Sequence, residues 1–253
     1  MNLQDAKAMV LGGWGLVGMA VCRKILERSP RTLFLLSLRR EEAEEACQIL
    51  AKGYPHVRFV PLWGDVFLTE SLKDRTRAEI MENAELRAQF VASNFERPSE
   101  EALSRFFLHR IILEHRPDVI VDCINSATAL AYQDVYSAYY RAKNALEHAR
   151  VGKGQETGLI EATEKFLGTV SLPQLIRHIQ VLLDATRRAE THTYVKVGTT
   201  GTGGMGLNIP YTHSEERPSG QLLAKSSLAG AHSMLLFLMG RTPGCPYIKE
   251  IKP

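Results

Sequence analysis

Short apolar runs alternate with amphipathic, charged stretches along much of the chain. The run at 32–38 (TLFLLSL) is apolar almost throughout, as expected for a strand buried on both faces of a sheet. Stretches of helical character at 19–28 and 41–52 separate the first runs. The alternation predicts an α/β fold with a parallel sheet. The runs interpreted as strands are 7–11, 32–38, 57–62, 117–124, 193–197 and, as a candidate sixth, 246–251.

Two intervals between predicted strands are longer than a βαβ crossover needs, with about fifty residues before the fourth strand and about seventy before the fifth. Residues 70–115 are charged and helix-like, and 132–166 contain a second helical stretch. We interpret both as helical insertions in a single domain spanning 1–253. Decoration of the rim of the sheet is the favoured interpretation, and a partner surface or lid is the alternative.

Composition narrows the class of protein. The 253 residues are 45% hydrophobic, with a formal net charge of +3. The sequence contains no dense block of Lys and Arg, so it does not indicate a protein that binds nucleic acid. No run approaches the roughly 20 apolar residues of a membrane helix. The four cysteines are scattered without a C-x-x-C pair, which predicts reduced thiols and no metal site. We therefore expect a soluble cytoplasmic protein, without a signal peptide, that acts on a small molecule.

A cluster of glycines stands between the first predicted strand and the helix after it. Gly13, Gly15 and Gly18 spell G-x-G-x-x-G, while Gly12, Gly15 and Gly18 spell G-x-x-G-x-x-G. Glycine allows a sharp turn and close approach of backbone N–H groups to an anion, and the following helix directs its positive end there. The context predicts a dinucleotide site, against the alternative of a ligand-free turn. The predicted contacts are Gly12, Gly13, Trp14, Gly15, Leu16, Val17 and Gly18.

Several further segments, in their order along the chain, carry a resemblance to a known family. They are GDVF at 64–67, HRPDVIVDCINSATA at 115–129, FLGTVSLPQLIRHIQVLLDATRRA at 166–189, YVKVGTTGTGG at 194–204 and YTHSEERPSGQLLAKSSLAGA at 211–231. With the glycine turn, they resemble the extended short-chain dehydrogenase/reductase family, whose members are NAD-dependent epimerase/dehydratase-like. The resemblance implies a Rossmann-type, doubly wound parallel sheet. It also implies that Asp65 and Val66 meet the adenine, and that Asn125, Ser126 and Ala127 lie beneath the nicotinamide ribose.

The resemblance implies three catalytic groups: a Tyr, a Lys four residues later, and a Ser or Thr at the end of the fifth strand. Lys225 matches the Lys, and Thr199 or Thr200 matches the hydroxyl. The Tyr position falls on Gln221, and a Gln amide does not exchange a proton near neutral pH. The catalytic Tyr is therefore not found at its expected place.

The chain offers other residues that could replace that Tyr. Tyr139 and Lys143 spell Y-x-x-x-K but precede the fifth strand, so we interpret them as a chance pair on an amphipathic helix. Tyr211 and His213 lie nearer to Gln221, on the expected substrate loop, without a pattern that requires a role.

The residues after the second predicted strand bear on the choice of cofactor. An acidic residue there suits the ribose of NAD, whereas this chain has Ser37, Arg39 and Arg40, with no acid until Glu41. A guanidinium suits the 2′-phosphate of NADP, so NADP is favoured over NAD. The alternative is that both arginines face solvent.

Together these features predict an NAD(P)-dependent oxidoreductase, or a related epimerase or dehydratase, acting on a carbonyl or hydroxyl carbon, with a sugar derivative as one candidate substrate. The alternative is a non-catalytic dinucleotide-binding scaffold or sensor, favoured by Gln221. The sequence ends where the sixth predicted strand would finish, so we expect the C-terminal substrate lobe of the family to be short or absent. A homo-oligomer that packs through the segment SSLAGAHSMLLFLMG is a further hypothesis.

Overall fold

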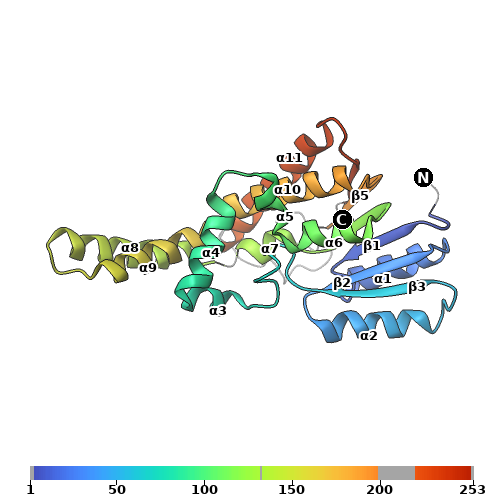
Figure 1. The fold of residues 1–253 in the computed structure, drawn as a ribbon, viewed down its shortest axis with the longest axis horizontal. Helices are drawn as coiled ribbons and strands as arrows, with labels where there is room; N and C mark the ends of the chain where they lie inside the picture. Colours follow the sequence, from blue (N-terminus) through green and yellow to red (C-terminus); the bar gives the residue numbers. More distant parts are fainter. Residues whose placement is uncertain (1–2, 132, 199–219, 252–253) are drawn as a thin grey trace.

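The structure is a computed structural model that describes residues 3–131, 133–198 and 220–251. These residues form a six-stranded parallel sheet in the order β3-β2-β1-β4-β5-β6 (Figure 1). This order confirms the predicted Rossmann-type α/β fold, and it reverses direction between β1 and β4. The strands are β1 (Lys7–Leu11), β2 (Thr32–Ser37), β3 (Arg58–Trp63), β4 (Val119–Asp122), β5 (Thr193–Val197) and β6 (Tyr247–Ile251).

Helices cover both faces of the sheet. The described helices are α1 (Leu16–Leu26), α2 (Arg40–Ala51), α3 (Arg77–Glu82), α4 (Ala84–Phe95), α5 (Glu100–Ser104), α6 (Phe107–His115), α7 (Ser126–Ala131), α8 (Val135–Arg150), α9 (Glu156–Thr169), α10 (Ser171–Arg188) and α11 (Gly220–Gly240).

Alternate residues of the strands build two separate cores. Ala8 and Val10 of β1 pack with the buried residues of α1 and α2, whereas Met9 and Leu11 pack with those of α6, α10 and α11. Successive side chains of a strand point to opposite faces, so an almost continuously apolar strand supplies both cores. This accounts for the apolar run from which β2 was predicted.

The first helix begins earlier than the sequence predicted. We expected a helix over 19–28, and α1 spans Leu16–Leu26. Gly15 has an extended backbone (φ −64°, ψ 162°) and is the N-cap, so the helix starts directly after the glycine turn. The predicted strand 117–124 is likewise shorter, since β4 ends at Asp122.

The two long intervals between strands contain extra helices. Helices α3, α4 and α5 precede α6, and α7, α8 and α9 precede α10. Helices α8 and α9 pack against each other as a hairpin that projects from the molecule on the side opposite the N-terminus (Figure 1). Both intervals follow the carboxyl ends of strands, which is the side of the sheet where Rossmann-type folds bind ligands, and Ala129 of α7 lines the cleft described below.

No helix in the described ranges combines the length and the apolar character needed to cross a membrane. All four cysteines are free thiols.

Candidate functional site: the cleft at the glycine turn

Three of the four glycines in the turn are required by the fold itself. Gly12 has a φ of +74°, a left-handed conformation that favours glycine. A Cβ on Gly13 would lie 2.5 Å from the side chain of Leu35, and one on Gly18 would lie 2.0 Å from the carbonyl oxygen of Gly12. Among the described residues, a Cβ on Gly15 would meet only that same oxygen, at 3.6 Å, which is an ordinary contact. Protein packing therefore does not explain a glycine at position 15.

Hydrogen bonds fix the turn to the end of β2. The N–H of Gly13 donates to the carbonyl of Leu36 at 2.8 Å, and the N–H of Trp14 donates to Ser37 Oγ at 3.2 Å. The indole of Trp14 donates to Glu45 of α2 at 3.2 Å. The turn is thus held between β1 and β2, with the N-terminus of α1 directly after it.

A cleft of about 360 Å³ opens at this turn. It lies at the carboxyl ends of β1 to β4, where the strand order reverses, which is the ligand-binding position in open α/β sheets. Its lining residues come from the turn, from the ends of β2, β3 and β4, and from α2 and α7: Gly12, Trp14, Gly15, Leu36, Ser37, Leu38, Glu42, Gly64, Asp65, Val66, Phe67, Cys123, Ile124 and Ala129.

Six of the residues predicted from the sequence to bind a cofactor line this cleft, namely Gly12, Trp14, Gly15, Ser37, Asp65 and Val66. Leu16 and Val17 do not, because their side chains lie on the outer surface of α1 and are 91% and 49% exposed. Gly13 and Gly18 shape the turn from behind, against Leu35 and the carbonyl of Gly12.

Asp65 follows β3 and is held by its surroundings. Its Oδ1 accepts the N–H of Phe67 at 2.9 Å. Burial raises the pKa of Asp65, and the Phe67 hydrogen bond and the charge of Arg77 oppose that rise. The carboxyl group therefore presents a fixed acceptor at the β3 side of the cleft.

The two arginines after β2 are not among the residues that line the cleft. Arg40 donates to Glu44 at 2.7 Å, and its guanidinium lies 5.1 Å from the centre of the Trp63 ring. Arg39 is exposed at the N-cap of α2, and its backbone N–H donates to Glu42 Oε2 at 3.4 Å. Near the end of β2 the cleft is instead lined by Glu42 of α2, a residue that sequence reasoning did not select.

A buried charged network lies at the ends of β4 and β5. Lys196 Nζ is 2.9 Å from Asp122 Oδ2, and the Tyr194 hydroxyl donates to the same oxygen at 2.7 Å. Burial alone would raise the pKa of Asp122, but the charge of Lys196 and the hydroxyl of Tyr194 hold it below its ordinary value. Sequence reasoning missed this network, although a lone Asp in VIVDCI and a lone Lys in YVKV are the signal, since buried charges are paired.

Lys196 also reaches the segment after β4 in which contacts to the nicotinamide ribose were predicted. Its Nζ donates to the carbonyl oxygen of Ile124 and to Ser126 Oγ, the latter at 3.3 Å. Ser126 is buried at the start of α7, Asn125 is half-buried, and the side chain of Ala127 lies outside the described part of the structure. The buried cation thereby fixes the backbone that leaves β4.

Two buried histidines face this network from α10 and α11. The rings of His178 and His232 are 6.3 Å apart, and His178 packs on Phe67 at 4.6 Å. Burial lowers their pKa to about 4 and about 3, so both rings are neutral at pH 7. Among the described residues, His178 Nδ1 and His232 Nε2 have no hydrogen-bond partner.

The predicted catalytic residues are described only in part. Thr199 and Thr200 lie outside the described residues, as does the side chain of Gln221. Lys225 is half-buried on α11, one turn before Leu228 and Ala229, which pack against Leu130 of α7. Helix α11 therefore brings the turn that carries Lys225 close to the helix that follows β4.

Of the residues that could replace the missing Tyr, some are described by the structure and others are not. Tyr139 and Lys143 lie on the projecting helix α8, where Tyr139 packs near Phe166 at 6.3 Å and Lys143 is 3.7 Å from Glu147. Neither is among the residues that line the cleft. Tyr211 and His213 lie outside the described residues.

The sequence matches no protein-family model and no curated protein. Among solved structures, a short-chain type dehydrogenase/reductase from Mycobacterium ulcerans is 12% identical, over 100% of this chain and 68% of that one, with a TM-score of 0.49. A short-chain dehydrogenase/reductase from Serratia marcescens BCRC 10948 is 14% identical, over 100% and 75%, with a TM-score of 0.48. The Bordetella bronchiseptica enzyme WbmH, in complex with NAD+, is 13% identical over 93% and 52%, with a TM-score of 0.40. The fold is accordingly established by the strand order of this chain and not by these similarities.

Proposed function

We propose that this chain binds a nicotinamide dinucleotide in the cleft at the glycine turn and acts as an NAD(P)-dependent oxidoreductase or a related epimerase or dehydratase. The observation that carries the proposal is Gly15. Packing leaves room for a side chain there, yet the position is glycine, at the N-cap of α1 and in the lining of the cleft. A pyrophosphate that approaches the backbone closely accounts for it, because helix N-termini favour anions.

The other lining residues suit the remaining parts of the dinucleotide. In this proposal Asp65 and Val66 contact the adenine, while Ser37 and Glu42, which also line the cleft, accept hydrogen bonds from the adenosine ribose. Asn125 and Ser126 follow β4, on the side proposed for the nicotinamide ribose. The bound nicotinamide would accept or donate a hydride, and the protein would hold it against a carbonyl or hydroxyl carbon of a small-molecule substrate.

The choice between NADP and NAD depends on two neighbouring residues. The preference for NADP stays a prediction, and it now rests on Arg39, because Arg40 is paired with Glu44. Glu42 instead supports NAD, since a carboxylate hydrogen-bonds the ribose hydroxyl that NADP carries as a phosphate. Arg39→Asp is expected to lower the affinity for NADPH and to spare NADH.

The proposal is tested by calorimetric titration of the protein with NADH and, separately, with NADPH. We expect a dissociation constant of about micromolar or tighter for one of them. Gly15→Ala places a methyl group in the cleft and is expected to weaken that binding about tenfold. The matched control is Gly230→Ala on α11, where a Cβ would meet no described atom within 4 Å outside the backbone of its own helix. Absence of binding to both nucleotides, or equal affinities of the two variants, would contradict the proposal.

A second candidate function, a non-catalytic dinucleotide-binding module, is favoured by Gln221 at the position of the catalytic Tyr. We propose that in the enzyme Lys225 orients the nicotinamide ribose and that Thr199 or Thr200 holds the substrate oxygen. A hydride-transfer assay over sugars, ketones and aldehydes separates the two functions. Turnover that falls in Lys225→Ala supports the enzyme, whereas tight nucleotide binding without turnover on any of them favours the module.

A further inference from the structure

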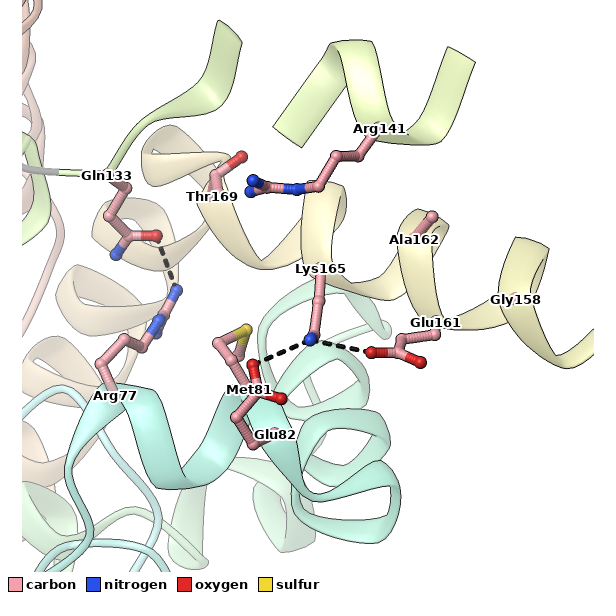
Figure 2. Close-up of a pocket in the computed structure, with 10 residues that line it drawn as sticks. All are labelled: Arg77, Met81, Glu82, Gln133, Arg141, Gly158, Glu161, Ala162, Lys165 and Thr169. Carbon is pink, nitrogen blue, oxygen red and sulfur yellow. Dashed lines mark hydrogen bonds and ion pairs between the residues drawn. The ribbon is translucent and has the colours of Figure 1, made fainter. Parts of the chain in front are cut away.

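A second cavity, of about 510 Å³, lies away from the cleft at the base of the α8–α9 hairpin (Figure 2). Helices α3, α8 and α9 form its walls, together with Gln133 from the connection between α7 and α8. Each of the three helices contributes one cation to the lining: Arg77 from α3, Arg141 from α8 and Lys165 from α9. Three basic side chains from distant parts of the sequence thus face one space.

The carboxylates in this lining are already engaged. Lys165 Nζ lies 2.8 Å from both Glu82 and Glu161, which are the acidic residues of the cavity wall (Figure 2). Both carboxylates share the single cation of Lys165, and among the described residues neither makes an ion pair with Arg77 or Arg141. The lining therefore carries one more cation than it carries carboxylates.

Arg77 is held in place by neutral partners. Its guanidinium donates to Gln133 Oε1 at 2.8 Å and to the carbonyl of Gly168, and its face lies 3.9 Å from the centre of the Phe90 ring. Within the described residues it makes no ion pair. Burial lowers the pKa of Arg77 to about 10, against the opposing charge of Asp65, so the side chain is poorly hydrated and still charged at pH 7.

Arg141 is exposed and reaches the same space from the opposite wall. Figure 2 shows its guanidinium extending toward Thr169. Its charge lowers the pKa of Asp134, yet no carboxylate in the described ranges lies within ion-pair distance of it. Like charges that face one cavity are unfavourable unless an anion lies between them, and guanidinium groups bind carboxylate and phosphate oxygens with two hydrogen bonds each.

We propose that this cavity binds a small organic anion whose carboxylate or phosphate group lies between Arg77 and Arg141. Met81 and Ala162 supply apolar wall next to these charges, so the ligand has an apolar portion as well as its anionic group. The site is separate from the dinucleotide cleft and does not depend on the function proposed for it.

The test is a calorimetric titration of the full chain with sodium phosphate and, separately, with sodium succinate, at constant ionic strength in chloride. Both titrations are run with and without saturating NADH, because inorganic phosphate also suits the glycine turn. We expect saturable binding of at least one probe that is unaffected by NADH. Binding that is lost when NADH is present would assign the anion to the turn and overturn the proposal.

The decisive variant is Arg141→Gln, which removes an exposed charge without breaking an ion pair of the described residues. It is expected to weaken binding by about tenfold, as loss of a charged hydrogen-bonding partner does. Arg150→Gln, at the exposed end of the same helix and outside the cavity lining, is the matched control and should bind like the unaltered protein. Arg77→Lys keeps the charge and loses the planar fork, and should also weaken binding. Equal affinities of the Arg141 and Arg150 variants, or no saturable binding of either probe, would overturn the proposal.

Discussion

Gly15 and Gly18 are three residues apart in the glycine turn, but the structure assigns them different roles. A methyl group on Gly18 would overlap the carbonyl oxygen of Gly12 at 2.0 Å, whereas one on Gly15 has room. Gly18 is therefore required by packing within the protein, whereas Gly15 is the glycine whose absence of a side chain we attribute to a bound ligand.

Substitution by alanine is expected to destabilise the protein much more at Gly18 than at Gly15. Gly18→Ala should lower the free energy of unfolding by about 2 kcal/mol or more, because the turn must move to relieve the overlap. Gly15→Ala should cost less than about 1 kcal/mol, since N-cap preferences are of that size. Urea denaturation followed by circular dichroism measures both, and equal losses would contradict the assignment.

The ion pair between Lys196 and Asp122 is the other residue-scale feature that can be tested. Lys196→Met leaves the carboxylate of Asp122 buried with the Tyr194 hydroxyl but without its cation. The expected cost is about 3–5 kcal/mol, because a buried charge then lacks its counter-charge. Denaturation curves should show no such loss for the control Lys249→Met on β6, which is exposed. A Lys196 variant as stable as the control would show that the pair contributes nothing.

At the scale of elements, the α8–α9 hairpin is fastened to the body of the molecule by a partly buried ion pair. Arg87 of α4 is 4% exposed, and its Nε donates to Glu164 of α9 at 2.8 Å. Arg87 also donates to the carbonyl of Met81 at 2.8 Å, so its guanidinium links α4, α9 and the end of α3. The walls of the second cavity depend on this link.

Removing the carboxylate should loosen the hairpin before it affects the sheet. Glu164→Gln is expected to cost about 2–4 kcal/mol locally, since it leaves the buried Arg87 charge unpaired. Hydrogen exchange followed by mass spectrometry should show faster exchange in α8 and α9, with β1 and β4 unchanged. The control is Glu147→Gln on the exposed side of α8. Faster exchange spread evenly over the molecule would contradict a local fastening.

For the whole molecule, the buried histidines make stability depend on pH. The folded pKa values, about 4 for His178 and about 3 for His232, lie below the ordinary 6.5, so the folded protein binds fewer protons than the unfolded chain. The stabilisation that comes from keeping these two histidines neutral is fully present above about pH 6.5 and is lost as the pH is lowered toward 4. The lowered pKa of Asp122 acts in the same direction at still lower pH.

Between pH 7.5 and pH 4.5, each of the two histidines should lower the free energy of unfolding by about 2–3 kcal/mol. His232→Leu removes one titrating group, so its stability should fall less steeply over this range. His148→Gln, on the exposed surface of α8, should follow the unaltered protein. Chemical denaturation at several pH values measures the slopes, and identical slopes for the two variants would show that His232 does not titrate on unfolding.

The sequence by itself determined the class of fold and the position of the glycine turn. Apolar runs of strand length and glycines between a strand and a helix are local signals, and local signals survive without tertiary context. Asp65 and Val66 were selected through the resemblance of the segment at 64–67 to a known family, and Ser37 through its position about twenty residues after the glycine turn.

Only the tertiary structure decided that packing leaves room for a side chain at Gly15 but not at Gly18. It also decided that Arg40 forms an ion pair with Glu44 and that Glu42 lines the cleft. It alone joined Asp122 to Lys196, 74 positions later in the chain, and placed Arg77, Arg141 and Lys165 around one cavity. The physical reason is that such contacts are set by strand order and by the packing of helices from distant segments. Periodicity and spacing along a chain report which side of its own element a residue occupies, but not which residue of another element it meets.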